Sequence, residues 1–183
     1  MSTIFLVLGI LFVLSLIPAG WLALHAYLKY RGARVITCPE ESCPAAVEVD
    51  VCRTAAAAAF GEHVVRLKSC SRWPERQACG QECLAQIEAA PAECLVRTML
   101  VDWYRGSSCV LCGKEIGEIH WVEHKPALFT PERKTVEWDE VPAEKLPQVL
   151  ATHQRVCWNC HIATTFRERF PGLVTERPAR RAP

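Results

Sequence analysis

Cysteine is the residue that most constrains what this chain can fold into. The sequence contains eleven cysteines among 183 residues, and all of them lie between Cys38 and Cys160. Four of them form two pairs in which two residues separate the cysteines, Cys109 with Cys112 and Cys157 with Cys160. An odd number of cysteines cannot pair completely in disulfides within one chain, which favours metal-bound or reduced thiols.

The two CxxC pairs predict a metal site. Two residues between cysteines allow a tight turn to direct both sulfurs at one ion, and two such turns supply the four thiolates of a tetrahedral zinc site. Gly113 follows the first pair and permits the positive φ that such a turn requires. We therefore expect a closed, structural zinc site formed by Cys109, Cys112, Cys157 and Cys160.

Residues 107–162 resemble a zinc ribbon, in which two cysteine knuckles at the tips of β-hairpins share one zinc. The sequence departs from the usual pattern because 44 residues separate Cys112 from Cys157, whereas about 15 to 20 are common. An inserted hairpin and helix would account for the extra length. The resemblance implies a zinc with four sulfur ligands and no open position for a substrate.

Two other interpretations of the second pair stay open. Cys157, Cys160 and His161 form a CxxCH motif, in which both cysteines would bond a c-type haem and the histidine would ligate its iron. Alternatively, Cys157 and Cys160 form a redox-active dithiol at the start of a helix, whose dipole lowers the pKa of the first thiol.

A second possible metal site consists of Cys70, Cys79, Cys83 and Cys94. We predict a helix over residues 79–89, on which Cys79 and Cys83 are four apart and share one face. An iron–sulfur cluster is compatible with these four thiols, although their spacing matches neither common ferredoxin pattern. The alternatives are reduced thiols that pack between two helices, or disulfides.

The N-terminal segment predicts a membrane anchor. Residues 4–24 carry no charge, and 21 helical residues rise about 30 Å, the thickness of the bilayer hydrocarbon core. A cleaved signal peptide is the alternative, but it has a basic start and a shorter apolar stretch. Lys29, Arg31 and Arg34 follow the segment, so the positive-inside rule predicts an inner-membrane protein with its N-terminus outside and its domain in the cytoplasm. A periplasmic domain is the alternative.

The sequence predicts an α+β fold with a single N-terminal transmembrane helix and a small Cys-rich domain. We expect hairpins over 35–38 with 47–51 and over 127–130 with 135–138, and a further strand over 118–124. The predicted organisation comprises a flank (1–3), the transmembrane helix (4–24), a basic linker (25–34), a Cys-rich subdomain (35–106), a zinc-ribbon-like subdomain (107–170) and a disordered tail (171–183).

No catalytic motif stands out in the sequence, which has no phosphate loop, dinucleotide fingerprint, Gly-x-Ser-x-Gly elbow or His-Glu-x-x-His. We therefore expect a membrane-anchored, zinc-binding accessory or interaction protein rather than an enzyme. The alternative is a membrane-tethered electron carrier with c-type haem or an iron–sulfur cluster. The expected partners are the lipid bilayer, through residues 4–24, and an unidentified membrane protein. A net charge of +1 gives no reason to expect nucleic acid.

Overall fold

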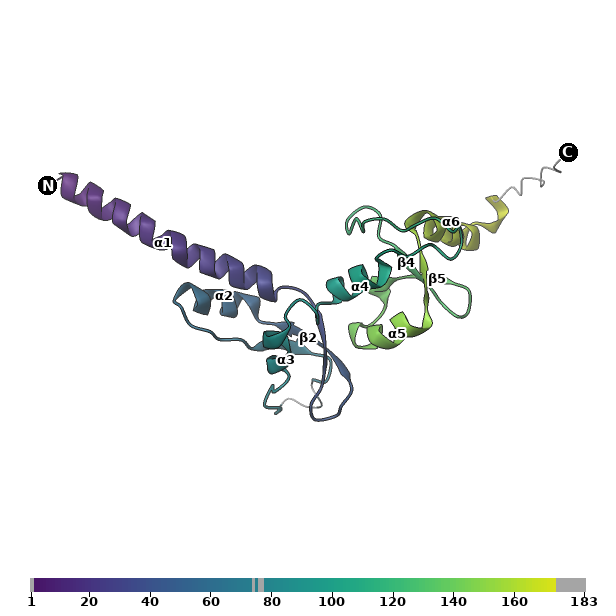
Figure 1. Cartoon of the computed structure of the whole chain (residues 1–183), viewed down its shortest axis with the longest axis horizontal. Helices are drawn as coiled ribbons and strands as arrows, with labels where there is room; N and C mark the ends of the chain where they lie inside the picture. Colours follow the sequence, from purple (N-terminus) through teal and green to yellow (C-terminus); the bar gives the residue numbers. More distant parts are fainter. Residues whose placement is uncertain (1, 74, 76–77, 174–183) are drawn as a thin grey trace. The chain divides into compact units, whose positions relative to one another are not determined.

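The chain is α+β and divides into two compact units. The structure is a computed structural model that describes residues 2–73, 75 and 78–173 (Figure 1). Unit 1 comprises Met1–Leu100 with Ala143–Leu146, and unit 2 comprises Val101–Pro142 with Pro147–Pro183.

Unit 1 contains three strands and the first helices of the chain. Its elements are α1 (Ser2–Tyr30), β1 (Arg34–Thr37), β2 (Pro44–Val49), α2 (Val51–Ala59), β3 (Leu67–Cys70), α3 (Leu84–Ala89) and the first part of α4 (Val96–Tyr104). The strands form an antiparallel sheet in the order β1-β2-β3. Alternate residues of β1 and β2 point to the same face, so Ile36, Ala45 and Val47 enter one core together with Ile87 of α3.

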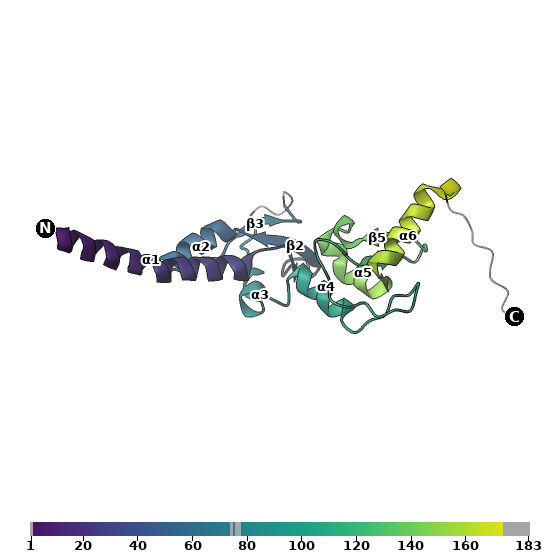
Figure 2. The same ribbon diagram turned by 90° about the horizontal axis from the view of Figure 1, so that it is seen from above.

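Helix α1 packs against α2 through small residues (Figure 2). Ala19, Ala23 and Ala26 recur at three- and four-residue intervals along α1 and are less exposed than the residues beside them. Helix α2 carries a run of five alanines, and Asp50 caps its start by accepting a hydrogen bond from the Arg53 N–H (3.1 Å). Small side chains on both helices allow their backbones to approach closely.

The prediction of a transmembrane helix over residues 4–24 is contradicted. Among the residues that the structure describes, no helix combines the length and the apolar character needed to cross a membrane. The prediction counted uncharged residues along the sequence. In the structure the helix continues to Tyr30. Ala19 and Ala23, inside the predicted span, are partly buried, and Ala26 and Tyr30, after it, are buried within unit 1.

Arg34, the first residue of β1, is buried beside the C-terminal end of α1. The Arg34 guanidinium donates hydrogen bonds to the carbonyls of Lys29 and Tyr30, both at 2.6 Å, and to that of Gly32 at 3.0 Å. The last carbonyls of a helix have no partner within the helix, so a cation that binds several of them stabilises the helix end. Burial lowers the pKa of Arg34.

Unit 2 is built around a second small antiparallel sheet, in the order β5-β4-β6. Its elements after α4 are β4 (Ala127–Phe129), β5 (Thr135–Glu137), the 3-10 helix η1 (Trp138–Glu140), most of α5 (Leu146–Thr152), β6 (Gln154–Val156), α6 (Trp158–Arg169) and the 3-10 helix η3 (Pro171–Leu173); the 3-10 helix η2 (Ala143–Lys145) lies largely in unit 1. Ala127 and Leu128 are fully buried, and the Tyr104 hydroxyl donates a hydrogen bond to the Ala127 carbonyl (2.7 Å).

Several predicted boundaries differ from the structure. The helix expected over residues 79–89 begins at Leu84, so Cys79 lies in a loop, Cys83 is the N-cap residue, and the two do not share a helical face. In place of the strand expected over residues 118–124 there are turns and one isolated bridge between His120 and His124. Of the tail predicted as disordered, residues 171–173 form η3, and residues 174–183 lie outside the described residues.

We predict that Arg34→Lys lowers the free energy of unfolding by about 2 kcal/mol, because one ammonium cannot replace a guanidinium that donates to four carbonyls. Chemical denaturation followed by circular dichroism measures the change. Arg31→Lys is the matched control, because Arg31 is exposed. Equal stability of the two variants would contradict the capping role of Arg34.

Candidate metal centre

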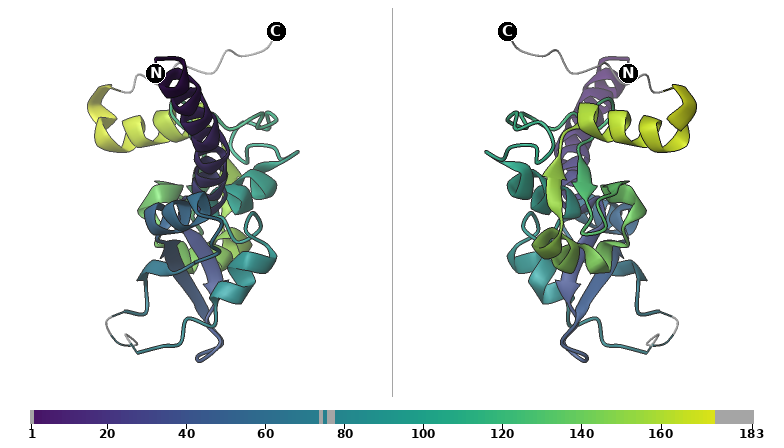
Figure 3. Two further views of the ribbon diagram at one scale, coloured as in Figure 1. Left: turned by 90° about the vertical axis from the view of Figure 1, so that its left-hand side faces the viewer. Right: turned by 90° about the vertical axis from the view of Figure 1, so that its right-hand side faces the viewer.

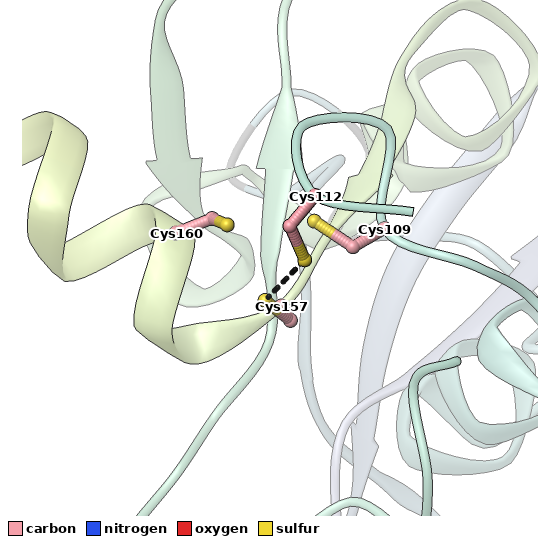
Figure 4. A group of neighbouring side chains, drawn as sticks. All are labelled: Cys109, Cys112, Cys157 and Cys160. Carbon is pink, nitrogen blue, oxygen red and sulfur yellow. Dashed lines mark hydrogen bonds between the residues drawn. The ribbon is translucent and has the colours of Figure 1, made fainter. Parts of the chain in front are cut away.

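The first CxxC pair lies on a tight turn. The Gly113 N–H donates to the Cys109 carbonyl and the Cys109 N–H donates to the Lys114 carbonyl, both at 2.8 Å, which closes the turn. Gly113 has a φ of +71°, a conformation that glycine adopts without steric cost. The turn expected from the sequence is therefore present, and it directs the two sulfurs to the same side (Figure 4).

The second pair lies at a junction between a strand and a helix. Strand β6 ends at Val156, Cys157 follows in an extended conformation, and α6 begins at Trp158 (Figure 3). Cys160 is in the first turn of α6, where the His161 N–H donates to the Cys157 carbonyl (3.0 Å). The arrangement thus differs from the zinc-ribbon expectation that both pairs lie at hairpin tips.

Backbone and side-chain contacts bring the two segments together. The Val110 N–H, inside the first turn, donates to the carbonyl of Arg155 in β6 (2.9 Å). Arg155 is itself fixed, because its Nε donates to the Trp103 carbonyl (2.6 Å) and its guanidinium lies 4.4 Å from the centre of the Trp103 ring. The first turn is therefore attached to the strand that leads into the second pair.

The four sulfurs converge on one point. The Sγ atoms of Cys109, Cys112, Cys157 and Cys160 all lie within 4.8 Å of one another. Cys112 and Cys157 come from different segments, and their sulfurs are 3.8 Å apart (Figure 4). In a tetrahedral site with Zn–S bonds of about 2.3 Å, neighbouring sulfurs lie about 3.8 Å apart. The cluster is therefore compatible with a metal site of the kind that the spacing predicts.

The pKa of one thiol in the cluster is lowered, whereas the pKa values of two others are raised. Burial disfavours the thiolate of Cys109, but N–H groups of Cys157, Cys112 and Leu111 point at its sulfur, and the net effect lowers its pKa to about 7. Burial raises the pKa of Cys157 and of Cys160, and neighbouring thiols contribute to both rises. A bound cation would offset this cost, because it favours the charged form of each sulfur.

His161, the ligand required by the haem alternative, is turned toward the sheet. Its ring is buried, with Nδ1 3.0 Å from the Thr135 hydroxyl and Nε2 3.5 Å from a Glu137 carboxylate oxygen. Both residues belong to β5, so the histidine joins the first turn of α6 to the sheet. In this arrangement Cys160 points to the sulfur cluster, whereas both ring nitrogens of His161 already have protein partners.

Only three of the four cysteines predicted as a second metal site lie at the same cavity. Cys70, Cys79 and Cys83 line one cavity of unit 1, and a residue missed by the sequence analysis, Cys38, lines it with them. Cys94 is not among the lining residues. Its sulfur lies 3.7 Å from the Pro91 carbonyl, and burial raises its pKa while the nearby Arg34 opposes that rise. A signal for Cys38 was available, because it is two residues after Ile36 on the buried face of the predicted hairpin.

In comparisons with protein-family models, curated proteins and solved structures, the chain shows no significant match. The functional interpretation therefore depends on the chemistry and geometry of the residues themselves.

We predict that Gly113→Ala weakens metal binding roughly tenfold, because a side chain in the left-handed region costs about 1 to 2 kcal/mol. A Cβ at this position meets no atom within 4 Å, so the cost is conformational rather than steric. Competition with a chromophoric chelator measures the affinity. Gly117→Ala is the matched control, since Gly117 has open space and no positive φ. Equal effects of both substitutions would contradict the role of the turn.

We also predict that acidification releases the metal. The ion binds thiolates, and the raised pKa values of Cys157 and Cys160 mean that both must lose a proton on binding near neutral pH. The apparent affinity should then fall at least about 100-fold per pH unit between pH 7.5 and 6.5, since these two thiols each release one proton. Chelator competition at a series of pH values tests this, and an affinity that does not change with pH would contradict thiolate ligation.

Proposed function

We propose that this chain is a zinc-binding accessory or interaction protein in which the ion holds unit 2 together. The observation that carries the proposal is the convergence of four cysteine sulfurs, with 3.8 Å between those of Cys112 and Cys157. Four thiolates in a tetrahedral arrangement are the ligand set of structural zinc sites.

The distances between the four sulfurs favour a single metal ion over an iron–sulfur cluster. Tetrahedral sulfur sites in proteins hold zinc or iron. In an iron–sulfur cluster, iron and sulfide atoms stand between the cysteine ligands and separate their sulfurs further than a single ion does. All four sulfurs here lie within 4.8 Å of one another, which suits a single ion. Zinc is the ion we propose, and a single iron bound by the same thiolates would be distinguished by its colour.

The site is closed, which supports a structural role. Four protein ligands complete a tetrahedral shell and leave no position for a substrate. Structural zinc contributes about 10 to 16 kcal/mol in small zinc-binding peptides, as much as or more than the whole stability of a typical domain. The strands of unit 2 have three residues each, so its sheet alone offers few interactions, and the ion would be the main link between the first turn and α6.

The interaction part of the proposal is supported by the apolar surface of α6. Ile162, Phe166 and Phe170 are four residues apart, each is more than 40% exposed, and the rings of Phe166 and Phe170 lie 5.2 Å apart. Contiguous exposed apolar side chains are typical of surfaces that bind another molecule. Because α6 begins at the metal ligands Cys157 and Cys160, zinc would fix the start of the helix that carries this surface.

We predict that Cys109→Ser and Cys157→Ser lose zinc and unfold unit 2. Serine does not supply a thiolate, and the binding energy of the ion is folding energy in such a site. Elemental analysis of the purified full-length chain should give one zinc per chain for the natural sequence. Hydrogen exchange should show loss of protection in β4, β6 and α6 of both variants.

Cys52→Ser is the matched control, because Cys52 is an exposed cysteine in α2 of unit 1. This variant should keep its zinc and its protection pattern. Retention of one zinc and of full protection by both Cys109→Ser and Cys157→Ser would refute a shared structural site. A visible absorption band with iron in place of zinc would refute the choice of metal.

A further inference from the structure

Four of the remaining cysteines surround a single cavity in unit 1. The cavity is lined by Cys38, Cys70, Cys79 and Cys83, together with Arg72 and Trp73 and with apolar residues of the core. Its volume is about 30 Å³, about twice what one water molecule requires. The cavity therefore has room for more than a single atom among the thiols.

The fold explains how cysteines far apart in the sequence reach this cavity. Cys38 follows β1 on the same face as the buried Ile36, and Cys70 ends β3 opposite the buried Val47. Cys79 lies in the loop after β3, and Cys83 is the N-cap residue of α3, whose Ile87 covers the same face of the sheet. Two thiols thus come from the sheet and two from the segment that covers it.

All four thiols at the cavity are at least partly shielded from solvent. Cys83 is 7% exposed, and Cys38, Cys70 and Cys79 are each partly buried. Four thiols gathered in this way are costly to ionise together unless a cation lies between them.

Two residues that line this cavity each carry a buried N–H group with no acceptor among the described residues, Nε1 of Trp73 and Nε of Arg72. The other guanidinium nitrogens of Arg72 have partners: Nη2 donates to the Cys43 sulfur (2.7 Å), and Nη1 lies 3.6 Å from a Glu41 carboxylate oxygen. Buried donors are almost always satisfied, so each such group needs an explanation. Thiolate and sulfide sulfurs are acceptors, and N–H groups directed at them are a common feature of cysteine-ligated metal centres.

The spacing of these thiols differs from that of the first site. Within the described part of the chain, the Cys109 group is the only one whose ligand atoms all lie within 4.8 Å of one another. The four thiols around the cavity are therefore more widely spaced than ligands of a single ion. A centre with several metal atoms would place its cysteine ligands further apart.

We propose that Cys38, Cys70, Cys79 and Cys83 form a second metal centre that binds an iron–sulfur cluster, independent of the zinc site in unit 2. The cluster would occupy the cavity between the sheet and the segment before α3. Trp73 and Arg72 would be positioning residues that donate hydrogen bonds to its sulfur atoms. Cys94 would not be a ligand.

The test is anaerobic reconstitution of the full-length chain with ferric iron and sulfide in the presence of a thiol reductant, which supplies the ferrous iron and keeps the cysteines reduced. We expect bound iron and acid-labile sulfide, with the broad visible absorbance of sulfur-to-iron charge transfer. Cys38→Ser, Cys70→Ser and Cys83→Ser should each lower the bound iron at least about tenfold. Cys94→Ser and Cys52→Ser are the matched controls and should keep it.

Two further variants separate a cluster ligand from a residue needed only for folding. Trp73→Phe keeps the aromatic ring but removes the N–H, so it should retain the cluster and shift its reduction potential to a more negative value. Cys109→Ser should lose zinc but keep the iron–sulfur absorbance. The proposal is overturned if the natural chain binds no iron and sulfide, if Cys94→Ser loses them as Cys83→Ser does, or if these thiols hold zinc or form disulfides.

Discussion

A tight turn and the start of a helix, separated by 44 residues, direct four sulfurs to one point, and the rest of unit 2 is arranged to meet that requirement. The backbone hydrogen bond from Val110 to Arg155 attaches the first turn to β6, and the ring of His161 attaches the start of α6 to β5. The sheet itself is small. Its role is to hold the Cys109–Cys112 turn and the start of α6 at a distance that one ion could bridge.

Unit 1 differs because it buries a charged side chain and a polar one, Arg34 and Thr54, together with its apolar core. Arg34 is fully buried, and its two terminal guanidinium nitrogens donate to carbonyls at the end of α1, so the charge serves as a helix cap. Four cysteines of this unit, Cys38, Cys70, Cys79 and Cys83, line one cavity instead. Cysteines are thus arranged in two ways in the described residues, as a compact group of sulfurs in unit 2 and around a cavity in unit 1.

The sequence predicts that the four cysteines of the first site converge, but it does not predict which helices and strands carry them. A CxxC spacing followed by Gly113 specifies a turn within a few residues, so the convergence of the cysteines follows from local geometry. The position of Cys157 at the start of α6 depends on where β6 ends, which is decided by its pairing with β4. Periodicity places Cys79 on a helix, but Gln81 has a φ of +56°, which interrupts a helix, and α3 begins only at Leu84. The long uncharged run near the N-terminus predicts a span, but among the described residues no helix meets the length and hydropathy that a membrane span requires.

The central claim is that one zinc is bound by four cysteine sulfurs in unit 2. X-ray absorption at the zinc edge of the full-length chain measures the ligand type and bond length directly. We expect a single shell of four sulfurs at about 2.3 Å, with no lighter ligand. A shell that contains nitrogen or oxygen at about 2.0 to 2.1 Å, which would indicate histidine, carboxylate or water in place of a thiolate, would contradict it.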